Sequence, residues 1–226
     1  SIEGCRESIA SLSKFNVKTI LDFSAEGQED EASFDNTRDQ VIATAHMAKD
    51  HPDIPFCVVK LTGLGSRELM TKVQAGKELT PDEQAAFQRF KDRVEAIAKT
   101  AHDNGIKFMI DAEETWIQDV VDKIGYDLMH KYNKERPVVY NTYQFYCHEA
   151  YDRMIAAFDE ITSAGCFFAA KFVRGAYMEK ERARAEANGY ADPIQPNKAA
   201  TDKDFNRAQD FAISNIDKFS LLSGTH

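Results

Sequence analysis

The sequence predicts an α/β fold of parallel strands alternating with helices, in the form of a (βα)8 barrel of the TIM type. Three observations indicate this class. Short, almost continuously apolar runs recur along the 226 residues, as expected of strands covered on both faces. Segments with helical periodicity separate these runs. Polar side chains gather at the carboxyl ends of several predicted strands, where barrel enzymes carry their active sites.

Six segments are expected to form the strands. They are Val17–Phe23, Phe56–Leu61, Lys107–Asp111, Pro137–Asn141, Phe167–Val173 and Phe219–Leu222. A complete barrel of this type has eight strands. The sequence begins without methionine and ends within the last strand and its exit loop. We therefore interpret residues 1–226 as a single barrel domain with about six strands, incomplete at its C-terminal end.

Apolar residues return to helical spacing between the strands. These stripes predict helices over Asp82–Asn104, Thr115–Lys131 and Glu149–Ala164, with a further helix opening at Thr201. The first of them starts with Thr80, Pro81 and Glu83, which form the pattern of a capping box with proline in the first turn. Gly105 and Gly165 follow two of the helices and are expected to end them in the left-handed conformation.

A doubly wound open sheet is the competing arrangement. Its nucleotide-binding form carries a GxGxxG motif after the first strand. Here the first predicted strand is followed by residues 24–30, SAEGQED, an acidic loop that would repel a pyrophosphate. The barrel is therefore favoured.

Composition limits the classes of function. The 28 Lys and Arg against 37 Asp and Glu give a net charge of −9, which disfavours general binding to nucleic acid. The 15 Phe and 8 Tyr supply a core and exclude disorder as the main state. No apolar run approaches the ~20 residues of a membrane-spanning helix. The four cysteines are dispersed, which predicts buried free thiols and no structural zinc site.

Two predicted strands end in groups that could carry chemistry. Lys60 would serve as an anion anchor or a Schiff-base nucleophile, or it would pair with an acid of a neighbouring strand. Asp111 needs a cationic partner if it lies on the inner face, and Lys60 or Lys171 is the expected one. Glu113 and Glu114, which follow, are expected to lie at the N-terminus of the next helix, where its dipole favours anions.

The densest group of candidate residues is KFVRGAY, residues 171–177. Lys171 and Arg174 straddle the predicted end of a strand, and Gly175 with Ala176 allows close approach of backbone N–H groups to a ligand. Tyr177 adds an aromatic wall. This combination is typical of phosphate binding, and the alternative is an ion pair with the acid at the end of a neighbouring strand.

Amide and imidazole side chains give weaker signals. Asn141 and Gln144 follow a strand, and such amides suit the edge of a heterocycle such as a flavin. The histidines show no metal-binding spacing. His226 is the only one at a predicted strand end.

Several segments resemble the proline dehydrogenase family. They are VVKLTGLG (58–65), MIDAEET (109–115), VYNTYQFY (139–146), KFVRGAYMEKERARA (171–185), GYADPIQPNKAATDKDFN (189–206) and SGTH (223–226). They occur in the family's order. The long RGAYMEKERARA to ATDKDFN block is the most specific, and it looks closest to the eukaryotic-type subgroup, which also occurs in bacteria.

The resemblance implies a barrel that binds FAD non-covalently. It implies oxidation of L-proline to Δ1-pyrroline-5-carboxylate by hydride transfer to flavin N5, the first step of proline catabolism, with a membrane quinone as electron acceptor. It also implies peripheral association with the inner membrane from the cytoplasm in a bacterium, or a mitochondrial location in a eukaryote. No nucleic acid or metal is implied.

Site residues follow from their places in the motifs. Asp111 matches the active-site aspartate, and Lys171 matches the position near flavin N5, where many bacterial relatives have arginine. Lys60 matches the lysine that binds the substrate carboxylate, and Tyr177 an aromatic residue on the substrate side. Positions that match FAD contacts are Ala112, Gln144, Arg174, Gly175, Ala176, Thr225 and His226. The family's paired arginines lie beyond the last residue, so this chain alone is expected to bind proline weakly.

Three alternatives stay open. They are a hydroxyproline dehydrogenase of the same family, a Schiff-base lyase or aldolase, and a barrel without enzymatic activity. A flavin spectrum that bleaches on adding proline would exclude the last two.

Overall fold

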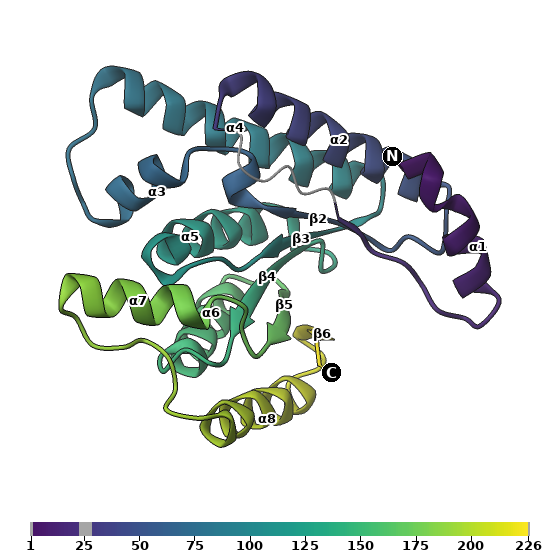
Figure 1. Ribbon diagram of the computed structural model, residues 1–226. Coiled ribbons are helices and arrows are strands. Elements are labelled where there is room, and N and C mark those ends of the chain that lie inside the picture. Colours follow the sequence, from purple (N-terminus) through teal and green to yellow (C-terminus); the bar gives the residue numbers. More distant parts are fainter. Residues whose placement is uncertain (1, 23–28, 226) are drawn as a thin grey trace. The chain divides into compact units, whose positions relative to one another are not determined.

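The computed structural model describes residues 2–22 and 29–225 (Figure 1). Two predicted features, the strand end at Phe23 and the site residue His226, lie outside the described residues. The chain divides into two compact units, Ser1–Asp111 and Ala112–His226, which are described in turn.

The first unit contains three parallel strands, β1 (Leu21–Asp22), β2 (Phe56–Lys60) and β3 (Lys107–Asp111). They follow one another in chain order, with Leu21 opposite Cys57 and Lys60 opposite Asp111. The helical elements are η1 (Ile2–Cys5), α1 (Arg6–Ser13), α2 (Glu31–Lys49), η2 (Leu61–Gly63), α3 (Arg67–Gln74) and α4 (Pro81–Asp103). The long helices α2 and α4 lie side by side, and they contact β2 and β3, respectively (Figure 1).

The start and end of α4 confirm the predicted signals. The Thr80 hydroxyl accepts a hydrogen bond from the backbone N–H of Glu83 at 3.3 Å, and the Glu83 carboxylate accepts one from the N–H of Thr80 at 2.8 Å. Gly105 follows the helix with φ of 73°, a conformation that costs glycine little because it has no Cβ. Local capping therefore sets both ends of this helix.

Ion pairs connect α2 to α4. The buried Arg93 on α4 contacts Glu31, donates from Nε to Asp35 at 2.9 Å, and donates from Nη1 to the carbonyl of Leu64 at 3.2 Å. Arg89 contacts Glu31 at 2.7 Å. Hydrogen bonds from Arg89 and Arg93 lower the pKa of Glu31 to about 2.

The second unit contains β4 (Val139–Gln144), β5 (Phe168–Val173) and β6 (Phe219–Ser223), again parallel and in chain order. Its helices are α5 (Thr115–Tyr132), α6 (Ala150–Ser163), α7 (Met178–Asn188) and α8 (Lys198–Ser214). Helices α5 and α6 contact β4, and α8 contacts β6.

Aromatic rings form much of the core of the second unit. Phe168 and Phe219 lie with ring centroids 4.9 Å apart, and Phe172 lies 5.6 Å from Phe219. Phe158 of α6 contacts Phe168 at 5.9 Å. These pairs are edge-to-face, which is a favourable orientation for aromatic quadrupoles. They pack α6 against the strands.

The fully buried Asn133 joins the end of α5 to two strands. Its amide nitrogen donates to the carbonyls of Val139 and Phe167 at 2.9 and 3.1 Å, and its side-chain oxygen accepts from the N–H groups of Val138 and Val139. One side chain thus satisfies four backbone groups that burial would otherwise leave unpaired.

Three predicted boundaries differ from the structure by three residues or more, for local reasons. Strand β4 continues to Gln144, past the predicted end at Asn141, because its polar residues are buried in the sheet. Helix α8 begins at Lys198 rather than Thr201, since the Asn197 side chain caps it by accepting from Ala200. Strand β1 begins at Leu21 rather than at Val17. Thr19, within the predicted range, donates its N–H to the backbone carbonyl of Asp53 instead of to a neighbouring strand.

The predicted α/β class with successive parallel strands is confirmed in both units. All four cysteines are free, as expected. Cys57 and Cys166 are buried, whereas Cys5 and Cys147 are half-buried.

Candidate functional site

Lys60 and Asp111 lie together in the first unit. Each is the last residue of its strand, and they are register partners on the neighbouring strands β2 and β3. Both are half-buried, and they follow buried apolar residues. A cationic and an acidic residue therefore lie opposite each other in register at the carboxyl edge of this sheet.

Lys171 occupies an inner position of β5 rather than its end. It is the register partner of Thr142 on β4 and of Leu222 on β6, and it is half-buried between Ala170 and Phe172. Arg174 follows the last residue of the strand. The two predicted cations thus differ in depth, one within the sheet and one just beyond it.

Three side chains, two from helix α8 and that of Thr225, contact the guanidinium of Arg174. Its Nε donates to Asp202 at 2.6 Å, its Nη1 donates to the hydroxyl of Thr225 at 3.0 Å, and its guanidinium carbon lies 4.4 Å from the ring centroid of Phe205. Lys198 and then Arg174 lower the pKa of Asp202 by donating hydrogen bonds to it. The carboxylate is therefore charged where it meets the guanidinium.

The turn after β5 crosses the ring of Tyr146. Gly175 has φ of 146°, and a Cβ at this position would lie 2.3 Å from that ring, so only glycine fits. The hydroxyl of Tyr146 accepts the N–H of Tyr177 at 3.1 Å. Burial raises the pKa of Tyr146 above its ordinary value, so the phenol stays protonated.

Gln144 connects this turn to the loop that precedes α5. Its side-chain oxygen accepts the N–H of Ala176 at 3.1 Å, and its amide nitrogen donates to the carbonyl of Glu113 at 2.8 Å. The N–H of Ala176, expected to face a ligand, is therefore engaged within the chain. The buried Ala112 lies in the same loop.

Glu181 of α7 fixes the other side of that loop. This fully buried carboxylate accepts the N–H and the hydroxyl of Thr115, both at 2.6 Å. Lys180 contacts the buried Glu114 at 3.3 Å. As expected, Glu113 and Glu114 precede the first residue of α5.

The structure brings together most of the residues predicted in the second unit. Gln144, Arg174, Ala176 and Thr225 form one connected group of hydrogen bonds and neighbouring residues. Asn141 does not join it, because its amide donates to Asp122 of α5 at 2.8 Å. The sequence analysis assigned no role to Tyr146, Glu181, Asp202 or Phe205, although all four lie in the segments that carry the family resemblance.

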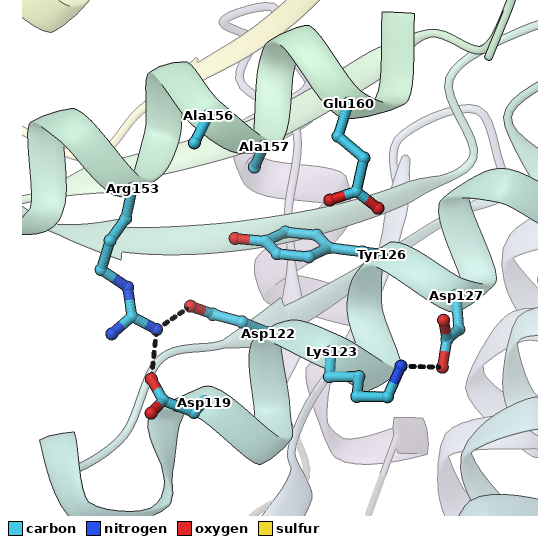
Figure 2. Close-up of a pocket in the computed structure, with 9 residues that line it drawn as sticks. All are labelled: Asp119, Asp122, Lys123, Tyr126, Asp127, Arg153, Ala156, Ala157 and Glu160. Carbon is cyan, nitrogen blue, oxygen red and sulfur yellow. Dashed lines mark hydrogen bonds and ion pairs between the residues drawn. The ribbon is translucent and has the colours of Figure 1, made fainter. Parts of the chain in front are cut away.

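A groove of about 380 Å³ lies elsewhere, between α5 and α6 (Figure 2). Tyr126 lies beneath small residues of α6, and Arg153 contacts Asp119 at 2.5 Å and Asp122 at 2.7 Å. The groove includes none of the predicted site residues. Within the groove, Arg153 is paired with the two aspartates and Lys123 with Asp127, whereas Glu160 contacts His130.

Clustered metal ligands and membrane-spanning helices are both absent from the described residues. No three His, Cys, Asp or Glu residues there are grouped as metal ligands would be. Within the same residues, no helix has both the length and the apolar character needed to cross a membrane.

Comparison with known proteins identifies the family. The sequence model described as "Proline dehydrogenase" matches residues 5–226. Human "Proline dehydrogenase 1, mitochondrial" is 36% identical over 137 residues, covering 61% of this chain and 23% of the human protein. The "Hydroxyproline dehydrogenase" of Xenopus laevis is 30% identical over 204 residues, covering 77% of this chain and 44% of that protein.

A solved structure shares the fold. Proline utilization A (PutA) from Bdellovibrio bacteriovorus, crystallised after inactivation by N-propargylglycine, superposes with a TM-score of 0.84 at 16% identity, covering 99% of this chain and 24% of PutA. This likeness confirms the predicted fold class. The chain spans less than half the length of each of these relatives. On the match over residues 5–226, the chain belongs to the proline dehydrogenase family.

Proposed function

We propose that this chain contributes the catalytic site of an FAD-dependent enzyme that oxidises L-proline to Δ1-pyrroline-5-carboxylate. The observation that carries the proposal is the pairing of Lys60 with Asp111 at the ends of β2 and β3, within two segments that resemble the family. Family membership supports the same activity. The single-domain interpretation of residues 1–226 stays a prediction.

The donors of the second unit fit FAD. A diphosphate needs a guanidinium or ammonium group, which Arg174 supplies, and a flavin ring edge needs amide-type partners, which Gln144 supplies. We propose that Ala112, Gln144, Arg174, Gly175, Ala176, Thr225 and His226 hold the cofactor. When bound, the flavin would accept hydride at N5 and pass electrons to a membrane quinone.

The charge of the remaining predicted residues suggests their roles toward the substrate. The Lys60 ammonium would bind the proline carboxylate, and Tyr177 would line the substrate side. The Lys171 ammonium would stabilise negative charge that develops near it during the reaction. Asp111, which lies opposite Lys60 in the register, would orient the substrate. Because the substrate amine must be neutral to release hydride, activity is expected to rise with pH.

Compartment and membrane contact depend on the source of the chain. The human relative is named as mitochondrial. We propose the same location for a eukaryotic source, and a cytoplasmic location with peripheral contact to the inner membrane for a bacterial one.

Hydroxyproline oxidation is the second candidate. The Xenopus relative, whose name specifies hydroxyproline dehydrogenase, supports it. Both substrates have a ring nitrogen and a carboxylate, so the proposed roles of Lys60 and Asp111 are the same for each.

An absorbance titration tests the proposal. The full chain with bound FAD is mixed with L-proline or hydroxyproline without an electron acceptor, and bleaching of the flavin is followed. Lys60→Met should lower the apparent second-order rate of bleaching about ten- to a hundred-fold, since a hydrogen bond to a charged group contributes about 1.5–3 kcal/mol.

Lys91→Met, on the exposed side of α4, is the matched control and should bleach like the wild type. A flavin that neither substrate bleaches would contradict the proposal. A carbonyl substrate trapped on Lys60 or Lys171 by borohydride would instead support Schiff-base chemistry.

A further inference from the structure

Asp202 and Phe205 contact Arg174 from a single face of α8. They lie three residues apart on the helix, so they are neighbours on its surface. The carboxylate of Asp202 accepts from Nε at 2.6 Å, and the ring of Phe205 lies 4.4 Å from the guanidinium carbon. Phe205 is fully buried and cannot follow a moving side chain. The plane of the guanidinium is therefore fixed by both contacts.

This arrangement leaves one edge of the guanidinium for a ligand. Arginine carries five N–H donors, and here Asp202 and Thr225 take two of them. Among residues 2–22 and 29–225, no acceptor takes the other N–H of Nη1 or the two of Nη2. Two neighbouring nitrogens that present parallel N–H groups suit the oxygens of a phosphate.

The cluster formed by Arg174, Lys198 and Asp202 has a net positive charge. Asp202 accepts from Lys198 at 2.5 Å as well as from Arg174, so one carboxylate stands against two cations. The Lys198 side chain is largely exposed. Asp202 thus orients the guanidinium without cancelling the attraction of the cluster for an anion.

We infer that Asp202 is a positioning residue that acts through Arg174, holding its outer edge ready for the diphosphate of FAD. The inference deepens the proposed function and rests on it. An arginine without this partner would sample many rotamers and would lose part of its binding free energy on being ordered.

Binding of FAD and of riboflavin to the full chain separates this role from others. Riboflavin has the flavin ring but no diphosphate, and both affinities can be measured by flavin fluorescence. Asp202→Asn keeps the hydrogen-bond acceptor and loses the charge, whereas Asp202→Ala loses both. Asp210→Ala, an exposed aspartate of the same helix, is the matched control.

We expect Asp202→Ala to weaken FAD binding about ten-fold, the equivalent of one hydrogen bond to a charged group. Asp202→Asn should stay within about three-fold of the wild type or bind more tightly, because it also removes a negative charge. Riboflavin affinity should be equal in all four proteins.

Other outcomes overturn the inference in distinguishable ways. Tighter FAD binding by Asp202→Ala would show that the Asp202 carboxylate opposes the binding of the diphosphate. A parallel loss of riboflavin affinity and of apo-protein melting temperature would make its role purely structural. Equal affinities in wild type and Asp202→Ala would reject positioning and leave the proposed function intact. A wild-type chain that binds neither flavin would reject the cofactor itself, and the positioning role with it.

A readout without ligand completes the test. In ¹⁵N NMR spectra, the Nε–H of Arg174 should exchange slowly with water in wild type and Asp202→Asn, because an acceptor protects it. Rapid exchange is expected in Asp202→Ala. Slow exchange in that variant as well would show that Asp202 does not fix the side chain.

Discussion

One contact from each unit of the chain illustrates a different force that holds its helices in place. In the first unit, Arg93 of α4 lies buried against Glu31 and Asp35 of α2, so charged groups join the two long helices. In the second unit, Phe158 of α6 packs edge-to-face on Phe168 of the sheet. Both units contain a parallel sheet, and ion pairs between helices and ring contacts between a helix and the sheet both contribute to their packing.

The difference matters because the two forces respond to different conditions. Ion pairs weaken when acid protonates the carboxylates or when salt screens the charges. Burial of aromatic surface involves no ionisable group, so acid does not titrate it and salt does not screen it. The following substitutions test this comparison, beginning with the largest expected effect.

Phe168→Ala should destabilise the protein most, by about 4 kcal/mol. The side chain is fully buried and contacts three rings, so its removal leaves a cavity in the core of the second unit. Urea unfolding measures the loss. Phe15→Ala is the control, since Phe15 is 77% exposed and should change the free energy of unfolding by less than about 0.5 kcal/mol. Equal losses in the two variants would refute the role of the aromatic core.

Arg93→Ala should cost about 3 kcal/mol in the first unit. The guanidinium is buried, and its loss removes one of the arginine donors of Glu31 and of Asp35, together with the donor to the carbonyl of Leu64. Arg89→Ala removes a half-exposed partner of the same Glu31 and should cost less than about 1 kcal/mol. The same urea titrations compare the two. If charge dominates, the difference between the two losses of unfolding free energy should become smaller in high salt. A difference that salt does not change would show that packing of the Arg93 side chain dominates.

Glu181→Ala should cost about 2 kcal/mol, which would show that the second unit also depends on one buried polar contact. Removing the carboxylate takes away the hydrogen bonds that Glu181 accepts from the N–H and the hydroxyl of Thr115. Glu181→Gln keeps an acceptor and should recover more than half of the loss, as measured by chemical denaturation. If glutamine is as damaging as alanine, the negative charge at the start of α5 matters more than the hydrogen bond.

Acid should weaken the first unit through Glu31. Its folded pKa of about 2 lies below the ordinary 4.5, so its contribution is present above pH 4.5 and is lost as the pH falls toward about 2. The side chain is half-exposed, which limits the effect to that of a surface pair, ~2–4 °C in melting temperature. Melting curves of wild type and Glu31→Gln should therefore differ at neutral pH and converge in acid. Curves that stay parallel would exclude this group.

The sequence predicted several elements to within one residue. Strand β3 matches its predicted range, Lys107–Asp111. Helix α4 starts and ends within one residue of the prediction, because Thr80 caps its start and Gly105 follows its end. Helix α7 had no predicted counterpart. It buries a carboxylate, Glu181, beside Ala185, so no apolar stripe marks it.

Part of the candidate site was also predictable. Lys60 and Asp111 were expected at strand ends, and they lie there, because neighbouring parallel strands bring their carboxyl ends to one edge. The partners of Arg174 were not predictable, since Asp202 and Thr225 are 28 and 51 residues away in the chain. The same holds for Gln144, whose spacing does not reveal that its amide bridges two loops.

Asn133 restricts the chemistry that its position tolerates. Aspartate has the same shape, but it would place a negative oxygen against the carbonyls of Val139 and Phe167, where the amide now donates. Deamidation at this residue would thus reverse the polarity of a contact on which two strands depend. A change of one amide oxygen or nitrogen would therefore weaken the second unit from its interior.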